Sequence, residues 1–161
     1  MRSSPLSLPP THPNLLHLQP TGLYNAAPNA YSHAVRVQEP VSWLFISGQG
    51  GENAQGLLPE DFAAQAEQAL ANVQTALAAG GASMADVIKL TVLIVDHGPQ
   101  RFEQWKQSVM RHWGSGDPSD PKPRFPACTL IPVQQLALPG MLIEVEATAA
   151  IAATSVDTQP R

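Results

Sequence analysis

The sequence predicts an α+β domain of two layers, in which two helices cover one face of a single mixed sheet. Three observations predict this fold class: two apolar stripes at helical spacing, several short runs rich in β-branched and aromatic residues, and their alternation along the chain. With 161 residues, 43% of them apolar, the chain can bury one core. A sheet covered on one face leaves the other in need of a partner, so we expect an oligomer.

The first half of the predicted domain holds two strands and a helix. Ala34–Val37 and Trp43–Ser47 are expected to be strands, followed by the glycine-rich loop G-Q-G-G-E-N-A-Q-G. Pro59 suits the first turn of the helix, and Gly80 with Gly81 ends it. The helix buries an apolar stripe made of Phe62, Ala66, Ala69, Leu70, Val73 and Leu77.

The second half follows the same alternation. A capping turn at residues 83–86 leads into an apolar strand at 87–95, which we expect to be covered on both faces. A helix from about Gln100 to Trp113 comes next, and strands at about 127–133 and 141–150 close the domain.

The chain divides into three expected regions. Residues 1–20 form a proline-rich N-terminal extension, 21–150 the folded domain, and 151–161 a flexible C-terminal tail. The extension lacks the continuous apolar core of a signal peptide, and no apolar run approaches the roughly 18–20 residues that span a bilayer.

Composition excludes several classes of function. A net charge of −4 and nine scattered basic residues argue against a nucleic-acid surface. The single cysteine rules out an intramolecular disulfide and a cysteine-based zinc site, and the five histidines show no metal-ligand spacing. We therefore expect no metal and no membrane, and a location in the reducing cytoplasm.

Three features are candidates for chemistry. Glu144 and Glu146 point to one face of a strand, where they need partners or a function, unless the strand is a solvated edge. S-G-Q-G-G at 47–51 lacks the lysine of a phosphate loop, so we interpret it as a tight turn. Cys128 has no obvious activator, because Arg124 lies about 13 Å away along an extended segment. A small buried hydrophobic side chain is the favoured interpretation of Cys128.

Six blocks, taken in order, resemble the Rid family, also called the YjgF, reactive-intermediate deaminase or endoribonuclease L-PSP family. The resemblance covers residues 21–150 and rests on the blocks Y-S-H-A-V, F-I-S-G-Q-G-G, F-A-A-Q-A-E-Q-A-L-A-N-V, D-V-I-K-L-T-V-L-I-V-D, F-P-A-C-T-L and L-I-E-V-E-A. It implies a chorismate-mutase-like fold and a homotrimer with a small-molecule cleft between subunits. It also implies hydrolysis of reactive enamines and imines to 2-oxo acids and ammonia, with no cofactor.

The resemblance also assigns site residues. Glu144 matches the glutamate that positions the attacking water, Tyr31 the tyrosine that reaches the cleft, and Ser47 with Gly48 the strand end that lines it.

One block departs from the family pattern. The family's P-A-R-T/S block carries an arginine that binds the substrate carboxylate, and here Cys128 stands in its place. Leu130 matches the residue whose backbone contacts substrate. A cysteine supplies no permanent positive charge, so we expect an altered ligand preference.

The sequence leaves two functions open. The first is an enamine or imine hydrolase of non-standard specificity, with a variant in which Cys128 is the reactive group. The second is a non-enzymatic trimer that binds a metabolite or regulates a partner. The acidic balance argues against the nuclease or translation-inhibitor role of the older family name.

Overall fold

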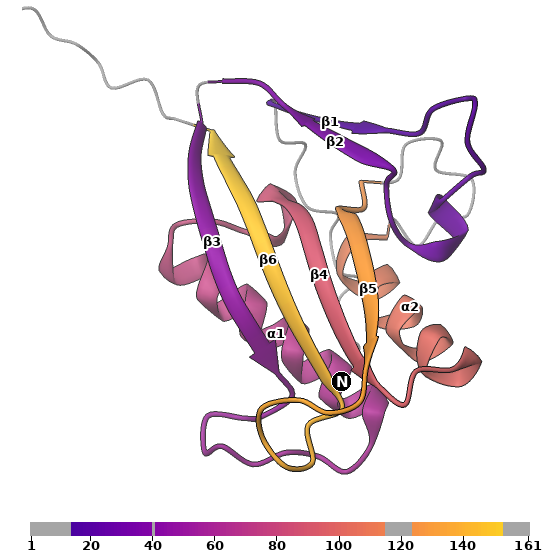
Figure 1. Ribbon diagram of the computed structural model, residues 1–161. Helices are drawn as coiled ribbons and strands as arrows, with labels where there is room; N and C mark the ends of the chain where they lie inside the picture. Colours follow the sequence, from indigo (N-terminus) through magenta and orange to yellow (C-terminus); the bar gives the residue numbers. More distant parts are fainter. Residues whose placement is uncertain (1–13, 40, 115–123, 153–161) are drawn as a thin grey trace, which may run out of the picture.

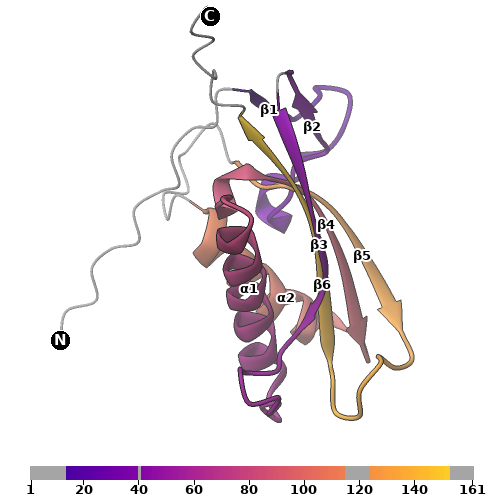
Figure 2. The same ribbon diagram turned by 90° about the vertical axis from the view of Figure 1, so that its left-hand side faces the viewer.

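The structure is a computed structural model that describes residues 14–39, 41–114 and 124–152. Two helices lie on one face of a four-stranded sheet, and a small two-stranded sheet stands beyond one end of it (Figure 1). Turned on its side, the molecule shows the two layers directly, with the helices on one side of the sheet only (Figure 2). The predicted α+β architecture is confirmed.

The four-stranded sheet has the order β3-β6-β4-β5. The strands are β3 (Val41–Gly50), β6 (Ile143–Ala152), β4 (Val87–Val95) and β5 (Ala127–Val133). Strand β6 pairs antiparallel with β3 and β4, whereas β4 and β5 are parallel. Because β6 lies inside the sheet, the edge-strand alternative for its glutamates is wrong.

The small sheet pairs β1 (Leu15–Leu18) with β2 (Ala34–Val37). Nothing in the sequence marked β1 as a strand, because the prolines around it suggested an unstructured extension. A short 3-10 helix, η1 (Ala27–Asn29), lies between the two strands.

The helices agree with the predicted stripes, with one shift in bounds. Helix α1 (Phe62–Ala79) is capped by Asp61, whose side chain accepts a hydrogen bond from the backbone N–H of Ala64 at 2.8 Å. The helix therefore begins after Pro59 rather than at it. Helix α2 (Pro99–Trp113) has a proline in its first turn, and η2 (Met84–Asp86) carries the predicted capping box. No described helix combines the length and apolar character needed to cross a bilayer.

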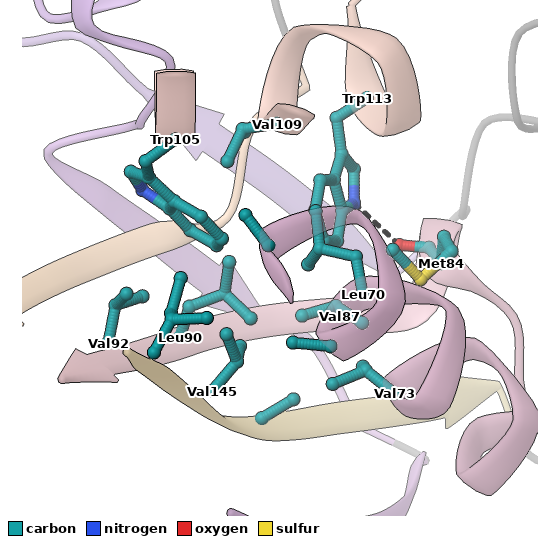
Figure 3. Close-up of a cluster of buried hydrophobic side chains, with 14 of the residues drawn as sticks. Leu70, Val73, Met84, Val87, Leu90, Val92, Trp105, Val109, Trp113 and Val145 are labelled. Carbon is teal, nitrogen blue, oxygen red and sulfur yellow. Dashed lines mark hydrogen bonds between the residues drawn. The ribbon is translucent and has the colours of Figure 1, made fainter. Parts of the chain in front are cut away.

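The core lies between the helices and the sheet (Figure 3). Trp105 and Trp113 of α2 pack there against aliphatic side chains of α1, β4 and β6. The indole Nε1 of Trp113 donates to the backbone oxygen of Met84 at 2.8 Å, so its polar atom is satisfied in the core. This packing holds the sheet rigid beneath its second face.

The second face of the sheet, which we call the open face, carries no helix. Phe45, Trp43 and Ile131 are 76%, 46% and 41% exposed there. Within the single chain one face of residues 87–95 is covered: Leu90, Val92 and Ile94 are buried, whereas the intervening residues are half-buried. Coverage of the second face by a partner subunit stays a prediction.

Candidate functional site

The site residues that the sequence predicts, together with neighbours that the structure adds to them, fall into two groups at different places on the sheet. The glutamate end, at the close of β3 and the start of β6, comprises Ser47, Gly48, Gly50, Glu52 and Glu144. The cysteine end, at the start of β5, comprises Tyr24, Tyr31, His33, Lys89 and Cys128.

A β-bulge shapes the glutamate end. Ile46 pairs with Ala147 and Gln49 with Val145, so two residues, Ser47 and Gly48, stand opposite one. A Cβ added at Gly48 would lie 2.7 Å from Cδ and 2.8 Å from Cγ of Glu144, and closer still to Oε1. Only glycine leaves room for this carboxylate. Gly48 and Glu144 therefore lie together within one chain, and Ser47 stands beside Gly48 in the bulge.

A second carboxylate lies against Gly50, the next glycine of β3. Gly50 pairs with Glu144, so the missing side chain of Gly50 would point to the same face. A Cβ there would lie 2.5 Å from Cε of Met141 and 3.2 Å from Cδ of Glu52, and closer to the Oε2 atom of Glu52. Sequence reasoning missed Glu52, because it stands in a loop and no spacing rule links it to Glu144.

Two amide side chains of α1 fix the backbone of the glutamate end. Asn72 Nδ2 donates to the backbone oxygens of Gly50 at 3.0 Å and Glu52 at 2.8 Å. Gln65 is fully buried; its Nε2 donates to Gly140 O at 2.9 Å, and its Oε1 accepts from the N–H of Leu142 at 2.8 Å. These bonds join α1 to both strands that carry the site.

Backbone and side-chain hydrogen bonds build the cysteine end. Ser32 forms a parallel bridge with Ala127, next to the start of β5. Strand β1 adds two clamps: His17 Nδ1 bonds the backbone oxygen of Phe125 at 2.8 Å, and just beyond the strand Gln19 Nε2 donates to the backbone oxygen of Tyr31 at 3.2 Å. The small sheet therefore holds the segments on which Tyr31 and Cys128 stand.

Two rings, those of Tyr24 and His33, lie against the ring of Tyr31. The hydroxyls of Tyr24 and Tyr31 are hydrogen-bonded, and the ring of His33 lies 5.1 Å from that of Tyr24 and 5.5 Å from that of Tyr31, centroid to centroid. Burial, followed by the bond to Tyr24, raises the pKa of Tyr31 to about 12. Tyr31 is thus a neutral hydrogen-bonding group at physiological pH. Tyr24 is a neighbour that the sequence did not single out.

Cys128 is a poor nucleophile in this environment. It is half-buried and packs against the core, and burial raises the pKa of its thiol to about 11 although the charge of Lys89 opposes the shift. The ammonium of Lys89 donates instead to the hydroxyl of Thr129. These features favour the interpretation of Cys128 as a small buried side chain over the reactive variant.

The two ends do not meet in one chain. Cys128 registers with the core residue Leu90, whereas Glu144 registers with Leu93, and Leu93 with Ile131. Cys128 therefore faces the helices and Glu144 the open face. Cys128 and Glu144 are separated by three positions along the strands and by two strands across the sheet. Their backbones therefore lie about 14 Å apart. Leu130, which registers with Val92, lies on the helix side with Cys128.

No cluster of three or more histidine, cysteine, aspartate or glutamate side chains suited to a metal ion exists within 14–39, 41–114 and 124–152. The chemistry available at the glutamate end is that of a carboxylate beside backbone amides.

The family model described as "Endoribonuclease L-PSP" matches residues 24–151. The chain is 42% identical over 73 residues to the 2-iminobutanoate/2-iminopropanoate deaminase of Bos taurus, a match that covers 44% of this chain and 51% of that protein. The chain thus matches only about half the length of this curated relative.

Solved structures agree with the family model. The Rid-family protein YyfB from Yersinia pestis is 35% identical, with a TM-score of 0.74, over 86% of this chain and 99% of that one. RidA from an Antarctic Psychrobacter is 31% identical, with a TM-score of 0.58, over 75% and 88% of the two chains. Escherichia coli TdcF, solved with bound serine, is 30% identical, with a TM-score of 0.57, over 76% and 88%. On these matches the chain belongs to the Rid (YjgF, endoribonuclease L-PSP) family.

Proposed function

We propose that the protein hydrolyses a reactive enamine or imine to a carbonyl compound and ammonia, with a specificity that differs from the 2-imino acids of the family. The observation that carries this proposal is the Glu144 carboxylate held against Gly48 on the open face. Deaminases of 2-imino acids among the relatives support the reaction class.

The reaction asks little of the protein. A water molecule adds to the carbon of the C=N bond while Glu144 accepts its proton, and the nitrogen takes up a proton to give the carbinolamine. Glu144 then passes its proton to the amino group, and ammonia leaves as the hydroxyl group loses its proton and becomes the carbonyl group. An enamine first takes a proton on carbon to become the imine. Because such compounds hydrolyse without a catalyst, orientation of water and substrate accounts for most of the expected acceleration.

The proposed site is a cleft between subunits of a homotrimer. Phe45, Trp43 and Ile131 expose large apolar side chains on the open face, which is the surface that a second copy would cover. The separation of the two ends within one chain supports the same arrangement, since a neighbouring subunit could bring its cysteine end toward Glu144. Assembly in the cytoplasm is part of this proposal.

Specificity follows from Cys128. Its neutral thiol cannot form the paired, charge-assisted bonds that an arginine makes with a carboxylate. A substrate carboxylate in the cleft would also be repelled by Glu144. The loss of this anchor equally supports a second candidate, a trimer that binds a metabolite without turning it over.

The decisive experiment measures ammonia release from freshly generated 2-iminopropanoate by the native protein and by Cys128→Arg. We expect little acceleration by the native protein and a gain in the variant, with both trimeric by analytical ultracentrifugation. Full activity of the native protein would refute the altered specificity. Inactivity of both proteins, together with ligand-dependent melting, would favour the binding protein.

A further inference from the structure

We propose that Glu52 is a second carboxylate of this site, and that with Glu144 it selects a cationic ligand that has no carboxylate, such as a protonated imine or an amidinium. This inference rests on the proposed function, because it assumes that the glutamate end lines the cleft.

The two carboxylates occupy equivalent places. Each is seated over a glycine of β3: Glu144 over Gly48, and Glu52 over Gly50. Gly50 is also the residue that pairs with Glu144 across the sheet, so both acids lie on the open face at the same end of the strand. The missing Cβ atoms provide the space that both side chains fill.

The Glu52 carboxylate lacks a donor. Its Oε2 atom is buried and accepts no hydrogen bond from any residue that the structure describes. A buried carboxylate oxygen without a donor is unfavourable by several times the free energy of an ordinary hydrogen bond. Glu52 and Glu144 also form no ion pair with any described lysine, arginine or histidine. In this proposal the ligand supplies the donor that the Oε2 atom of Glu52 lacks.

The position of positive charge agrees with this assignment. The cation of the open face, Lys89, registers with Thr148, whereas Glu144 registers with Leu93, which is four residues farther along β4, about 13 Å. Lys89 donates to Thr129, at the cysteine end. The glutamate end is thus acidic and uncompensated, and the arginine that would attract an anion is replaced by Cys128.

Three probes of one shape test the charge preference. Benzamidinium, benzamide and benzoate are planar and alike in size, and carry charges of plus one, zero and minus one; the C=NH₂⁺ group of the first resembles a protonated imine. We expect the native trimer to bind benzamidinium most tightly in NMR titrations. Glu52→Gln should weaken benzamidinium about five-fold, as removal of one nearby charge implies, and leave benzamide unchanged. Glu103→Gln, on α2 in the other layer, makes the same change of net charge and should have no effect.

A second variant keeps the inference testable if Glu52→Gln fails to fold. Gly50→Ala keeps the charge of Glu52 but displaces its carboxylate and the Cε atom of Met141, both flexible, and should weaken benzamidinium likewise. Tightest binding of benzoate, or equal binding of benzamidinium to native protein and both variants, would overturn the inference. If the native protein ranks the probes as expected but hydrolyses no imine, the proposed reaction fails while this inference stands.

Discussion

The glutamate end and the cysteine end of the sheet are built in opposite ways. At the glutamate end, glycines of β3 leave space that carboxylates fill, and amides of α1 hold the surrounding backbone. At the cysteine end, bulky rings fill the space, and the clamps come from His17 and Gln19. The glutamate end presents two carboxylates, and the cysteine end presents phenol hydroxyls and a half-buried thiol near the ammonium of Lys89.

This difference indicates which of the two positions, 144 or 128, is more tightly constrained by the surrounding structure. The Glu144 side chain occupies its present position only because residue 48 has no Cβ, so that position depends on the backbone of β3. Cys128 sits in a packed position that accepts a small apolar side chain, and its environment holds the thiol neutral. In the proposed reaction, water activation is assigned to Glu144 at the glutamate end and ligand selection to the residue at position 128.

The largest effect should come from removing the general base. Glu144→Gln is expected to lower imine hydrolysis about 100-fold or more, because the amide cannot accept the proton of water. Its matched control, Glu146→Gln, changes an exposed residue of the same face and should alter the rate less than about three-fold. Steady-state ammonia release measures the rates of both variants. Equal losses of rate would contradict the assignment of Glu144, rather than Glu146, as the general base.

Displacing the same carboxylate should have the next largest effect. Gly48→Ala places a Cβ where the Glu144 side chain now lies, and a shift of about 1 Å in a catalytic group costs up to about 100-fold in rate. Thermal unfolding should change little, because the flexible end of the side chain can yield. Gly22→Ala, which meets nothing within 4 Å, is the control. A Gly48→Ala protein with the native rate would mean that Glu144 need not sit there.

At the cysteine end, the thiol should be unreactive at neutral pH. With a pKa near 11 instead of the usual 9.0, the thiolate fraction at pH 7.5 is about 100-fold smaller. Alkylation of the native protein by iodoacetamide should be correspondingly slow and accelerate toward pH 11. Lys89→Met should slow it further, since the ammonium lowers the pKa of this thiol. Rapid labelling at pH 7.5 would instead support the hypothesis that Cys128 is a reactive group.

The smallest effect concerns Tyr24. Tyr24→Phe removes the hydroxyl bonded to Tyr31 and should lower the pKa of Tyr31 from about 12 toward its ordinary value, because the bond holds the neutral form. The unfolding free energy should fall by about 1 kcal/mol. Ultraviolet absorbance titration of the phenols measures the first change and urea denaturation the second. A pKa of Tyr31 that does not move would assign its shift to burial alone.

Much of the fold could be predicted from local patterns. Helical stripes and apolar runs located both helices and five strands, because burial imposes a period that the sequence must follow. Strand β1 was missed, since its pairing with β2 depends on contacts that neighbouring prolines conceal. The same limit explains why Glu52 and Tyr24 were not predicted. Each lies beside a residue from another segment of the chain, and no local sequence pattern indicates that contact.

Strand β5 ends the sheet, and among the residues that the structure describes its outer edge pairs only through the bridge between Ser32 and Ala127. Such an edge invites another chain to add a strand and so to aggregate. Pro132 stands in this strand and has no backbone N–H to offer. The proline therefore removes one hydrogen-bond donor from the edge with which another chain could pair. The parallel register of β5 with β4 is kept. Protection of this edge thus rests on Pro132, whereas the candidate site includes Cys128, four residues earlier in the same strand.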